Sequence, residues 1–235
     1  PKVLDTINRA LEFMKKEVIG PVPEKSGMSA VWSPPELDGN KNAPMPAKLG
    51  GTGLGLVAAI GTERISPSVM SLEELKRMGS FIVFMQKPDG SFYSKYIPDK
   101  GGRDDSWTSL YYPGEAALAL AMLYERDGSV EWLNAALRVL AYLAKMREGE
   151  DEVEPDHWAL ISTGLLLKHY DKTDKSVSKE TIESHALQIV SYMMKTRPDI
   201  PDTSPLYGDL LGDGRTTPPA TRLEGLLALL ELIER

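Results

Sequence analysis

The chain has 235 residues, of which 42% are hydrophobic, and it contains no cysteine. This length allows one large domain or two small ones, with a sizeable core. Because cysteine is absent, disulfides, thiol nucleophiles and thiolate metal sites are excluded, so a metal would need nitrogen or oxygen ligands.

The charge pattern and the apolar runs exclude two kinds of partner. The net charge is −7, and the 27 lysines and arginines form no basic stripe, so we expect no nucleic-acid partner. The longest apolar runs, such as 116–123, are far shorter than the roughly 20 residues of a membrane-spanning helix. The first residue is Pro1 rather than Met, which indicates a processed or trimmed chain, and the lack of cysteine favours an extracytoplasmic location.

Two kinds of predicted helix alternate along the chain. The first kind has one apolar side and covers 3–18, 71–86, 130–147 and 178–197. The second kind is apolar with few charges and covers 48–60, 110–124, 159–170 and 218–234. A proline-rich connection occupies 19–47, and no stretch alternates with a period of two for long enough to predict a strand.

Capping residues support these helix starts. Ser71 and Glu74 form a capping box, and Ser178 is a favoured N-cap. Thr52 is expected to cap the helix of 48–60, while Asp104 and Asp105 precede the helix of 110–124.

The alternation of the two kinds of helix predicts an all-α domain over 1–235 built from four helical hairpins. No such pair buries its own core, so we expect the apolar helices to lie inside a ring and the amphipathic helices to wrap it. The glycine-rich run 50–55 then serves close helix packing. It lacks the preceding strand and the following Lys-Ser/Thr of a phosphate loop.

A local motif and the alternation of helices both resemble a known superfamily. The segment 81–92, FIVFMQKPDGSF, looks like the QW repeat of the cyclase superfamily, with Phe92 where a tryptophan usually stands. In that repeat the glutamine and the aromatic residue tie the end of an outer helix to the next turn. The whole pattern is similar to the α/α toroid of terpenoid cyclases, protein prenyltransferase β-subunits and six-hairpin glycosidases. Because complete toroids usually have six or seven hairpins, four hairpins imply a smaller or open ring, or a missing part.

The members of this superfamily can be compared with the composition. A prenyltransferase needs a cysteine ligand to zinc, and the absence of cysteine therefore excludes this activity. A terpene cyclase needs an aromatic cavity and an aspartate-rich motif, and the composition disfavours this activity as well. The segments 106–124 and 130–143 resemble hairpins of bacterial toroid proteins that act on glycans, including the C-terminal domain of glucuronyl epimerases. This resemblance implies a hydrolase, lyase or epimerase of an acidic or neutral glycan that needs no cofactor.

In a toroid the inner helices run parallel, so the loops before them would converge in a cleft at one end. Carboxyl pairs flank the scissile bond in glycosidases, and sugars stack on aromatic faces. The catalytic candidates are Asp104, Asp105, Glu115, Asp156 and His157. The substrate-binding candidates are Trp107, Tyr111, Tyr112, Trp158, Arg215 and Arg222, with Asp209 and Asp213 in the last loop.

Each candidate also has a structural interpretation. Asp104, Asp105 and Asp156 are favoured N-cap residues. Glu115 and Glu224 lie within apolar turns, where a carboxyl must be paired or protonated, and Arg222 is the expected partner.

The histidines and the last loop bear on metal binding. We expect His169 and His185 to be packing or surface residues, and no histidine pair has metal-ligand spacing, so no metal site is predicted. Carboxylate-bound calcium in the loop 208–214 stays open as an alternative. A non-catalytic module that binds a glycan or a protein on the same concave face is the alternative to an enzyme.

Overall fold

The structure, a computed structural model, is predominantly helical and describes residues 2–38, 45–66 and 69–233. Residues 39–44 of the predicted connection and Glu234 of the last predicted helix lie outside the described residues.

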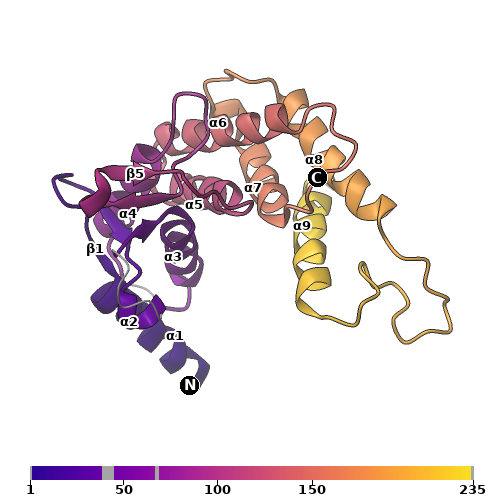
Figure 1. The fold of residues 1–235 in the computed structure, drawn as a ribbon, viewed down its shortest axis with the longest axis horizontal. Coiled ribbons are helices and arrows are strands. Elements are labelled where there is room, and N and C mark those ends of the chain that lie inside the picture. Colours follow the sequence, from indigo (N-terminus) through magenta and orange to yellow (C-terminus); the bar gives the residue numbers. More distant parts are fainter. Residues whose placement is uncertain (1, 39–44, 67–68, 234–235) are drawn as a thin grey trace.

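Four helices form an inner row in which each packs on the next. They are α3 (Leu49–Thr62), α5 (Tyr112–Asp127), α7 (His157–Lys168) and α9 (Thr217–Ile233). Helix α3 packs on α5, α5 on α7, and α7 on α9. The row bends into an arc, with α3 and α9 at its two ends (Figure 1).

A second layer covers the outer side of this row. It consists of α4 (Leu72–Phe84), α6 (Val130–Met146) and α8 (Lys179–Lys195), each packed against inner helices. The chain begins with α1 (Lys2–Phe13), which continues into a π-helical turn over Met14–Val18, and a short helix α2 covers Pro35–Asp38. Two 3₁₀ turns cover Pro98–Lys100 and Tyr170–Lys172.

Glycines allow the inner helices to approach closely. A Cβ atom on Gly53 would lie 3.2 Å from the backbone of α5, and one on Gly114 would lie 2.8 Å from the nitrogen of Ala159. A Cβ atom on Gly164 would lie 2.8 Å from the carbonyl oxygen of Ala228. The prediction that 50–55 serves helix packing is therefore confirmed, and glycines also serve the α5–α7 and α7–α9 contacts.

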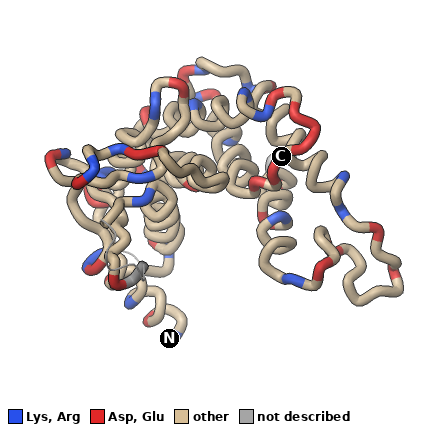
Figure 2. The backbone as a smooth tube through the Cα atoms, in the orientation of Figure 1, with Lys and Arg blue, Asp and Glu red and all other residues tan. Residues whose placement is uncertain are grey.

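Helix α5 is buried on nearly all sides, as its apolar sequence predicts. Ala116, Ala117 and Leu120 have no exposed surface. In Figure 2, α5 is largely free of charged positions, whereas residues of both signs are interspersed over the outer elements and loops.

Two predicted caps are confirmed. Ser71 accepts a hydrogen bond from the backbone nitrogen of Glu74, whose carboxylate accepts one from the nitrogen of Ser71. Ser178 accepts from the nitrogen of Thr181 at the start of α8. Both helices begin where the sequence places them, because the capping group is next to the first turn in the chain.

The prediction that Thr52 caps α3 is wrong, because the helix begins earlier, at Leu49. Thr52 lies inside the helix, where its hydroxyl donates to the carbonyl of Lys48 and accepts from the nitrogen of Val31. The hydroxyl therefore joins α3 to a strand instead of capping it.

Among the described residues, five strands of two or three residues lie in the segments between helices. β1 (Ile19–Pro21) pairs antiparallel with β2 (Ser29–Val31), and β3 (Ala47–Lys48), β4 (Lys95–Ile97) and β5 (Gly102–Asp104) form a second antiparallel sheet in that order. Such strands are too short to show a period of two in the sequence. The second sheet positions the loop that leads from β5 into α5.

Gln86, the glutamine of the QW-like segment, links two outer helices. Its amide nitrogen donates to the carbonyl of Ala135 in α6 at 2.9 Å, and its oxygen accepts from Arg138. Phe92 forms an isolated β-bridge with Gln86. The glutamine and the aromatic residue thus tie the end of α4 to the turn after it and to α6.

Candidate functional site

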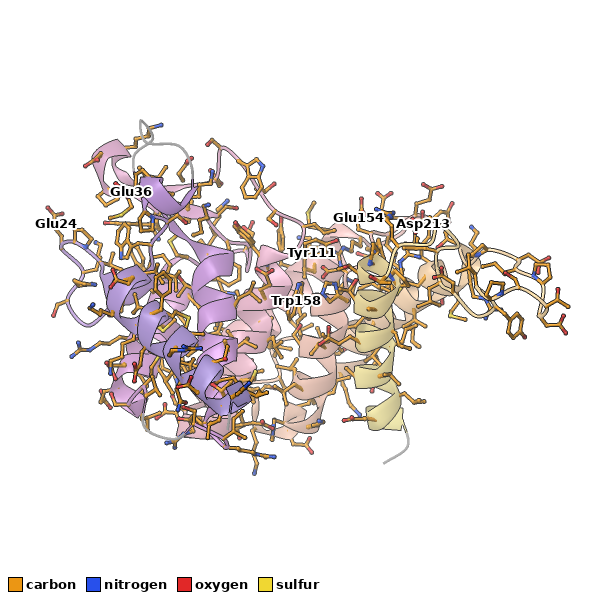
Figure 3. All side chains as sticks on the ribbon, turned by 90° about the horizontal axis from the view of Figure 1, so that it is seen from below. Glu24, Glu36, Tyr111, Glu154, Trp158 and Asp213 are labelled. Atoms are coloured by element: carbon orange, nitrogen blue, oxygen red, sulfur yellow. The ribbon has the colours of Figure 1, made fainter. Side chains whose placement is uncertain are left out.

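The N-terminal ends of the inner helices lie at one end of the molecule. In Figure 3, Tyr111 before α5, Trp158 at the start of α7 and Asp213 before α9 all lie toward this end. The loops before α5 and α7 are in contact, because the rings of Tyr111 and His157 are 5.5 Å apart. The starts of these three inner helices thus lie toward the same end of the molecule.

Five aromatic side chains lie in the loop before α5 and at the starts of α5 and α7, and we call them the aromatic surface. They are Trp107, Tyr111, Tyr112, His157 and Trp158. The ring of Trp107 meets that of Tyr112 edge-on at 5.5 Å, and His157 lies 4.8 Å from Trp158. Trp107 is 50% exposed and Tyr111 is 40% exposed. Large rings are therefore held by neighbouring rings while much of their surface faces solvent.

Asp104 and Asp105 do not cap α5, because the helix begins at Tyr112 and its N-cap position is Tyr111. Asp104 ends β5 and accepts hydrogen bonds from the backbone and hydroxyl of Ser106, which lower the pKa of its carboxyl. Asp105 pairs with Lys87. The capping interpretation is thus wrong, and both carboxylates are engaged in their own loop.

Asp156 caps α7, as the structural interpretation predicted. One carboxylate oxygen accepts from the nitrogen of Ala159 at 3.0 Å, and the other accepts from Arg147 at 2.8 Å. The residue is fully buried, and burial raises the pKa of its carboxyl against the opposing effect of Arg147. Asp156 therefore has a structural partner on each oxygen.

Arg147 extends this pair to helix α8. Its second terminal nitrogen lies 3.0 Å from Nε2 of His185, so this nitrogen of the imidazole acts as the acceptor. Burial and, to a smaller extent, the adjacent Arg147 together lower the pKa of His185 to about 3. His185 is therefore a neutral packing residue. The sequence missed Arg147, because its role depends on where α7 and α8 meet the end of α6.

Glu115 is the one catalytic candidate whose buried oxygen is left without a hydrogen-bond partner among the described residues. The side chain is 6% exposed, and Oε2 has no partner there. Burial and, to a smaller extent, the charge of Asp156 together raise the pKa of Glu115 to about 7. A Cβ atom on Gly50 would lie 2.4 Å from this oxygen and 2.2 Å from the ring of Tyr112, so both groups lie against the first turn of α3.

The predicted link between Glu115 and Arg222 is not formed. Arg222 donates to the carbonyl of Leu210, in the loop before α9. Glu224 is exposed rather than buried. Helix α7 lies between α5, which carries Glu115, and α9, which carries Arg222 and Glu224.

The loop before α9 is internally bonded. Asp213 accepts two hydrogen bonds from Arg215, which lower the pKa of its carboxyl, and Asp209 accepts from the nitrogen of Leu211. Helix α9 reaches the aromatic surface at Gly225, where an added Cβ atom would lie 3.1 Å from His157. Burial lowers the pKa of His157.

A cavity of about 220 Å³ lies beside the aromatic surface, and Tyr112 is part of both. Its wall includes two cations, Lys87 and Arg147, and several hydroxyl groups. The sequence did not reveal this cavity. Lys87 lies in a turn and Arg147 at a helix end, positions at which basic residues are common, so neither carried a signal.

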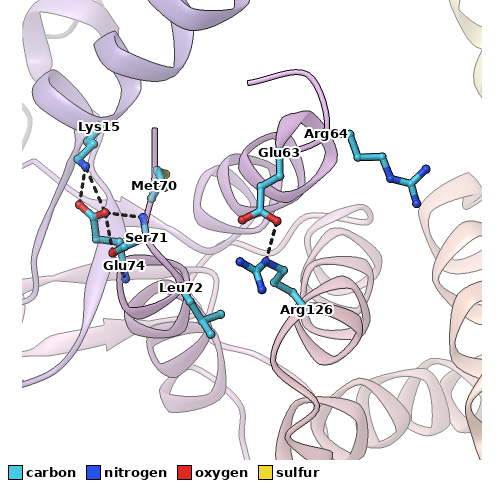
Figure 4. Close-up of a pocket in the computed structure, with 8 residues that line it drawn as sticks. All are labelled: Lys15, Glu63, Arg64, Met70, Ser71, Leu72, Glu74 and Arg126. Carbon is cyan, nitrogen blue, oxygen red and sulfur yellow. Dashed lines mark hydrogen bonds and ion pairs between the residues drawn. The ribbon is translucent and has the colours of Figure 1, made fainter. Parts of the chain in front are cut away.

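A larger pocket of about 640 Å³ lies at the opposite end of α3 and α5 (Figure 4). Its charged groups are mostly paired with each other: Lys15 with Glu74 at 2.9 Å, and Arg126 with Glu63 at 2.8 Å. Glu74 also completes the capping box of α4. These side chains have structural partners, so the aromatic surface remains the better candidate site.

Within the described ranges, no group of three or more acidic or histidine side chains is arranged to hold a metal ion. Of the helices in the described part of the chain, none has both the length and the apolar character to cross a membrane. Compared with known proteins, the chain matches no protein-family model and no curated protein.

Proposed function

We propose that this chain binds a glycan on the aromatic surface and that its arc of helices is a partial or open α/α toroid. The toroid interpretation is supported by the inner row of parallel helices with a second layer outside it. It is also supported by Leu223, Leu227 and Leu230, which are about half exposed on the side of α9 away from Gly225 and α7. A further inner helix of a complete toroid would pack on that side.

The observation that carries the binding proposal is the exposure of held aromatic rings. Sugars present apolar faces to aromatic rings, and a ring fixed by its neighbours loses little entropy when a ligand stacks on it. Trp107 and Tyr111 satisfy both conditions, because each is at least 40% exposed and each meets another ring edge-on.

Binding to a panel of oligosaccharides, measured by calorimetry, tests this proposal. Trp107→Ala and Tyr111→Ala should each weaken binding about tenfold or more, as expected for aromatic residues at the centre of a binding site. Tyr207→Ala is the matched control, because Tyr207 is 60% exposed in the loop before α9 and lies outside the aromatic surface. Equal affinity of Trp107→Ala, Tyr111→Ala and the unmodified protein would refute the proposal.

A non-catalytic role agrees with the state of the carboxylates. Hydrolysis of a glycosidic bond generally requires two carboxyl groups that flank the bond. Asp156 both caps α7 and pairs with Arg147, so its two oxygens already have buried structural partners. Binding without turnover is therefore the function that the geometry supports best.

An enzyme that uses Glu115 as its general acid is the second candidate. A carboxyl with a pKa of about 7 holds a proton near neutral pH and can donate it to a leaving oxygen. Its Oε2 is buried against Gly50 and beside Tyr112, so Tyr112 would have to turn away for a ligand to reach the proton.

Product analysis separates the two candidates. Oligosaccharides that bind are incubated with the protein, and the products are measured by chromatography. If the protein is an enzyme, Glu115→Gln abolishes product release while binding persists, and if it is a binding module, no product forms with either protein.

A further inference from the structure

We propose that the glycan bound by the aromatic surface carries an anionic substituent, a carboxylate or a sulfate ester, which enters the adjoining cavity and pairs with Lys87. This inference rests on the proposed glycan binding and adds the chemical class of the ligand.

The charge of the cavity wall is the first argument. The chain has a net charge of −7, yet the wall contains Lys87 and Arg147 and, among the residues that the structure describes, no acidic one. The remaining polar groups are mainly hydroxyls, which can donate hydrogen bonds to an oxyanion. They belong to Ser91, Ser94, Thr108, Ser109, Tyr112 and Tyr142.

Lys87 already holds a carboxylate in this structure, which is the second argument. Asp105 pairs with it, and this hydrogen bond raises the pKa of Lys87. The ammonium group also lies 4.7 Å over the ring of Tyr93. Asp105 lies in an exposed loop with its side chain 45% exposed, and exposed ion pairs contribute little to stability. A ligand anion can therefore replace Asp105 while Lys87 stays in position.

Arg147 differs from Lys87 in this respect. Its partners Asp156 and His185 are both buried, so its pairs are not exchanged for a ligand. Its side chain still forms part of the cavity wall. Lys87 is therefore the cation that contacts the ligand, and Arg147 lowers the cost of bringing an anion near it.

The cavity and the aromatic surface are continuous through Tyr112. Its ring contacts Trp107, and it also lines the cavity. The ammonium group of Lys95 lies 5.0 Å over the ring of Trp107. A sugar stacked on the exposed part of Trp107 therefore lies beside Lys95 and near the cavity.

The size of the cavity limits what enters it. About 220 Å³ corresponds to about seven water molecules at their volume in the liquid. This volume accommodates one charged substituent or one sugar unit, whereas a longer chain must stay on the surface. The cavity therefore takes one acidic substituent while the rest of the glycan stays on the aromatic surface.

Three probes test the inference: tetragalacturonate, its carboxyl-reduced neutral counterpart, and the same neutral tetramer carrying sulfate esters. Calorimetry on the full chain should give an anionic probe an affinity about tenfold above that of the neutral tetramer, as expected for a charge-assisted contact. The two anionic probes distinguish a carboxylate ligand from a sulfate ester.

Variants identify the contact. Lys87→Met should remove the preference for the anionic probe, whereas Lys100→Met, which makes the same charge change on an exposed residue outside the cavity, should keep it. Asp105→Asn should tighten binding of the anionic probe several-fold, because it frees Lys87 of its competitor. This gain cannot arise from misfolding.

The results separate this inference from the proposal on which it rests. Equal binding of neutral and anionic probes, reduced by Trp107→Ala, overturns the inference and leaves glycan binding in place. A preference that persists in Lys87→Met also overturns it. Absence of binding by every probe and by the oligosaccharide panel overturns both.

Discussion

At the scale of single residues, buried ionisable groups at one end of the inner row set the behaviour of the candidate site. Glu115, Asp156, Arg147 and His185 come from α5, the N-cap of α7, the end of α6, and α8. Only one of the four, Arg147, carries a fixed positive charge. The protonation of Glu115 therefore matters, because its ionised form adds a second buried negative charge near Asp156.

Glu115 should make the protein less stable as the pH rises from about 5 to 8. The folded state, with a pKa of about 7, retains a proton that the unfolded chain, with a pKa near 4.5, has released. Stability from this group is thus present below the lower pKa and is lost as the pH rises through the upper one. Between pH 5 and pH 8, the unmodified protein should therefore lose more unfolding free energy than Glu115→Gln loses. The difference between the two losses should be at most about 3 kcal/mol. Urea denaturation at both pH values measures it, and identical pH dependence of the two proteins would contradict the raised pKa.

Removing Arg147 should be costly, because it leaves the buried carboxylate of Asp156 without its cation. Arg147→Met is expected to lower the free energy of unfolding by about 3–5 kcal/mol. Arg126→Met is the control: its pair with Glu63 is partly exposed, so its loss should cost about 0–1 kcal/mol.

A double variant isolates the pair itself. Arg147→Met combined with Asp156→Asn should be less destabilised than the sum of the two single variants, because the amide no longer leaves an unpaired buried charge. Strict additivity in urea denaturation would show that the pair is not coupled.

At the scale of elements, the contacts between inner helices depend on glycine as much as on large apolar residues. In the α5–α7 contact, Gly114 lies against Trp158 and Ala159 with no room for a side chain. Such contacts allow helices that are buried on several sides to lie close together. They also make the contacts between inner helices sensitive to the addition of a single methyl group.

Gly114→Ala should destabilise the protein by about 1–3 kcal/mol, because the added methyl would lie 2.8 Å from the backbone nitrogen of Ala159. Gly61→Ala is the control within α3. The nearest atom to its added methyl is the terminal carbon of Met122, at 3.9 Å. This change should stabilise by about 0.5–1 kcal/mol through helix propensity. Thermal denaturation of both variants checks the contrast, which fails if the two changes have the same sign.

At the scale of the whole molecule, burial is higher in the middle of the arc than in the N-terminal helix α1. α5 and α6 contain long runs of fully buried side chains, whereas Leu11 is the one buried residue of α1, a helix that the structure describes in full. Parts with few buried contacts open at low free-energy cost, whereas the central core opens only with global unfolding.

Amide hydrogen exchange should follow this gradient. The amides of α5 and α6 are expected to exchange at rates set by global unfolding, and those of α1 should exchange faster by local opening. Mass spectrometry of peptic fragments measures it. Protection of α1 equal to that of α5 would show that α1 and the central helices unfold as one cooperative unit.

The sequence alone determined what depends on neighbouring residues in the chain. The period of the apolar residues predicted the helices, the caps at Ser71 and Ser178 predicted where two of them begin, and the lack of charge in 110–124 predicted a buried helix. The resemblance to a toroid implied that the inner helices run parallel, so the aromatic candidates before α5 and α7 were expected to lie at the same end. These features are local, or repeat along the chain, and are therefore visible in it.

Only the tertiary structure decided which side chains are partners. Asp105 pairs with Lys87, Arg147 joins Asp156 to His185, and Glu115 has an oxygen without a partner among the described residues, where the sequence predicted a link to Arg222. Each partnership depends on how far one helix is rotated and shifted against another, which the glycine contacts fix and the order of residues does not reveal. The same reason explains why a cavity lined by residues from several segments was found only in three dimensions.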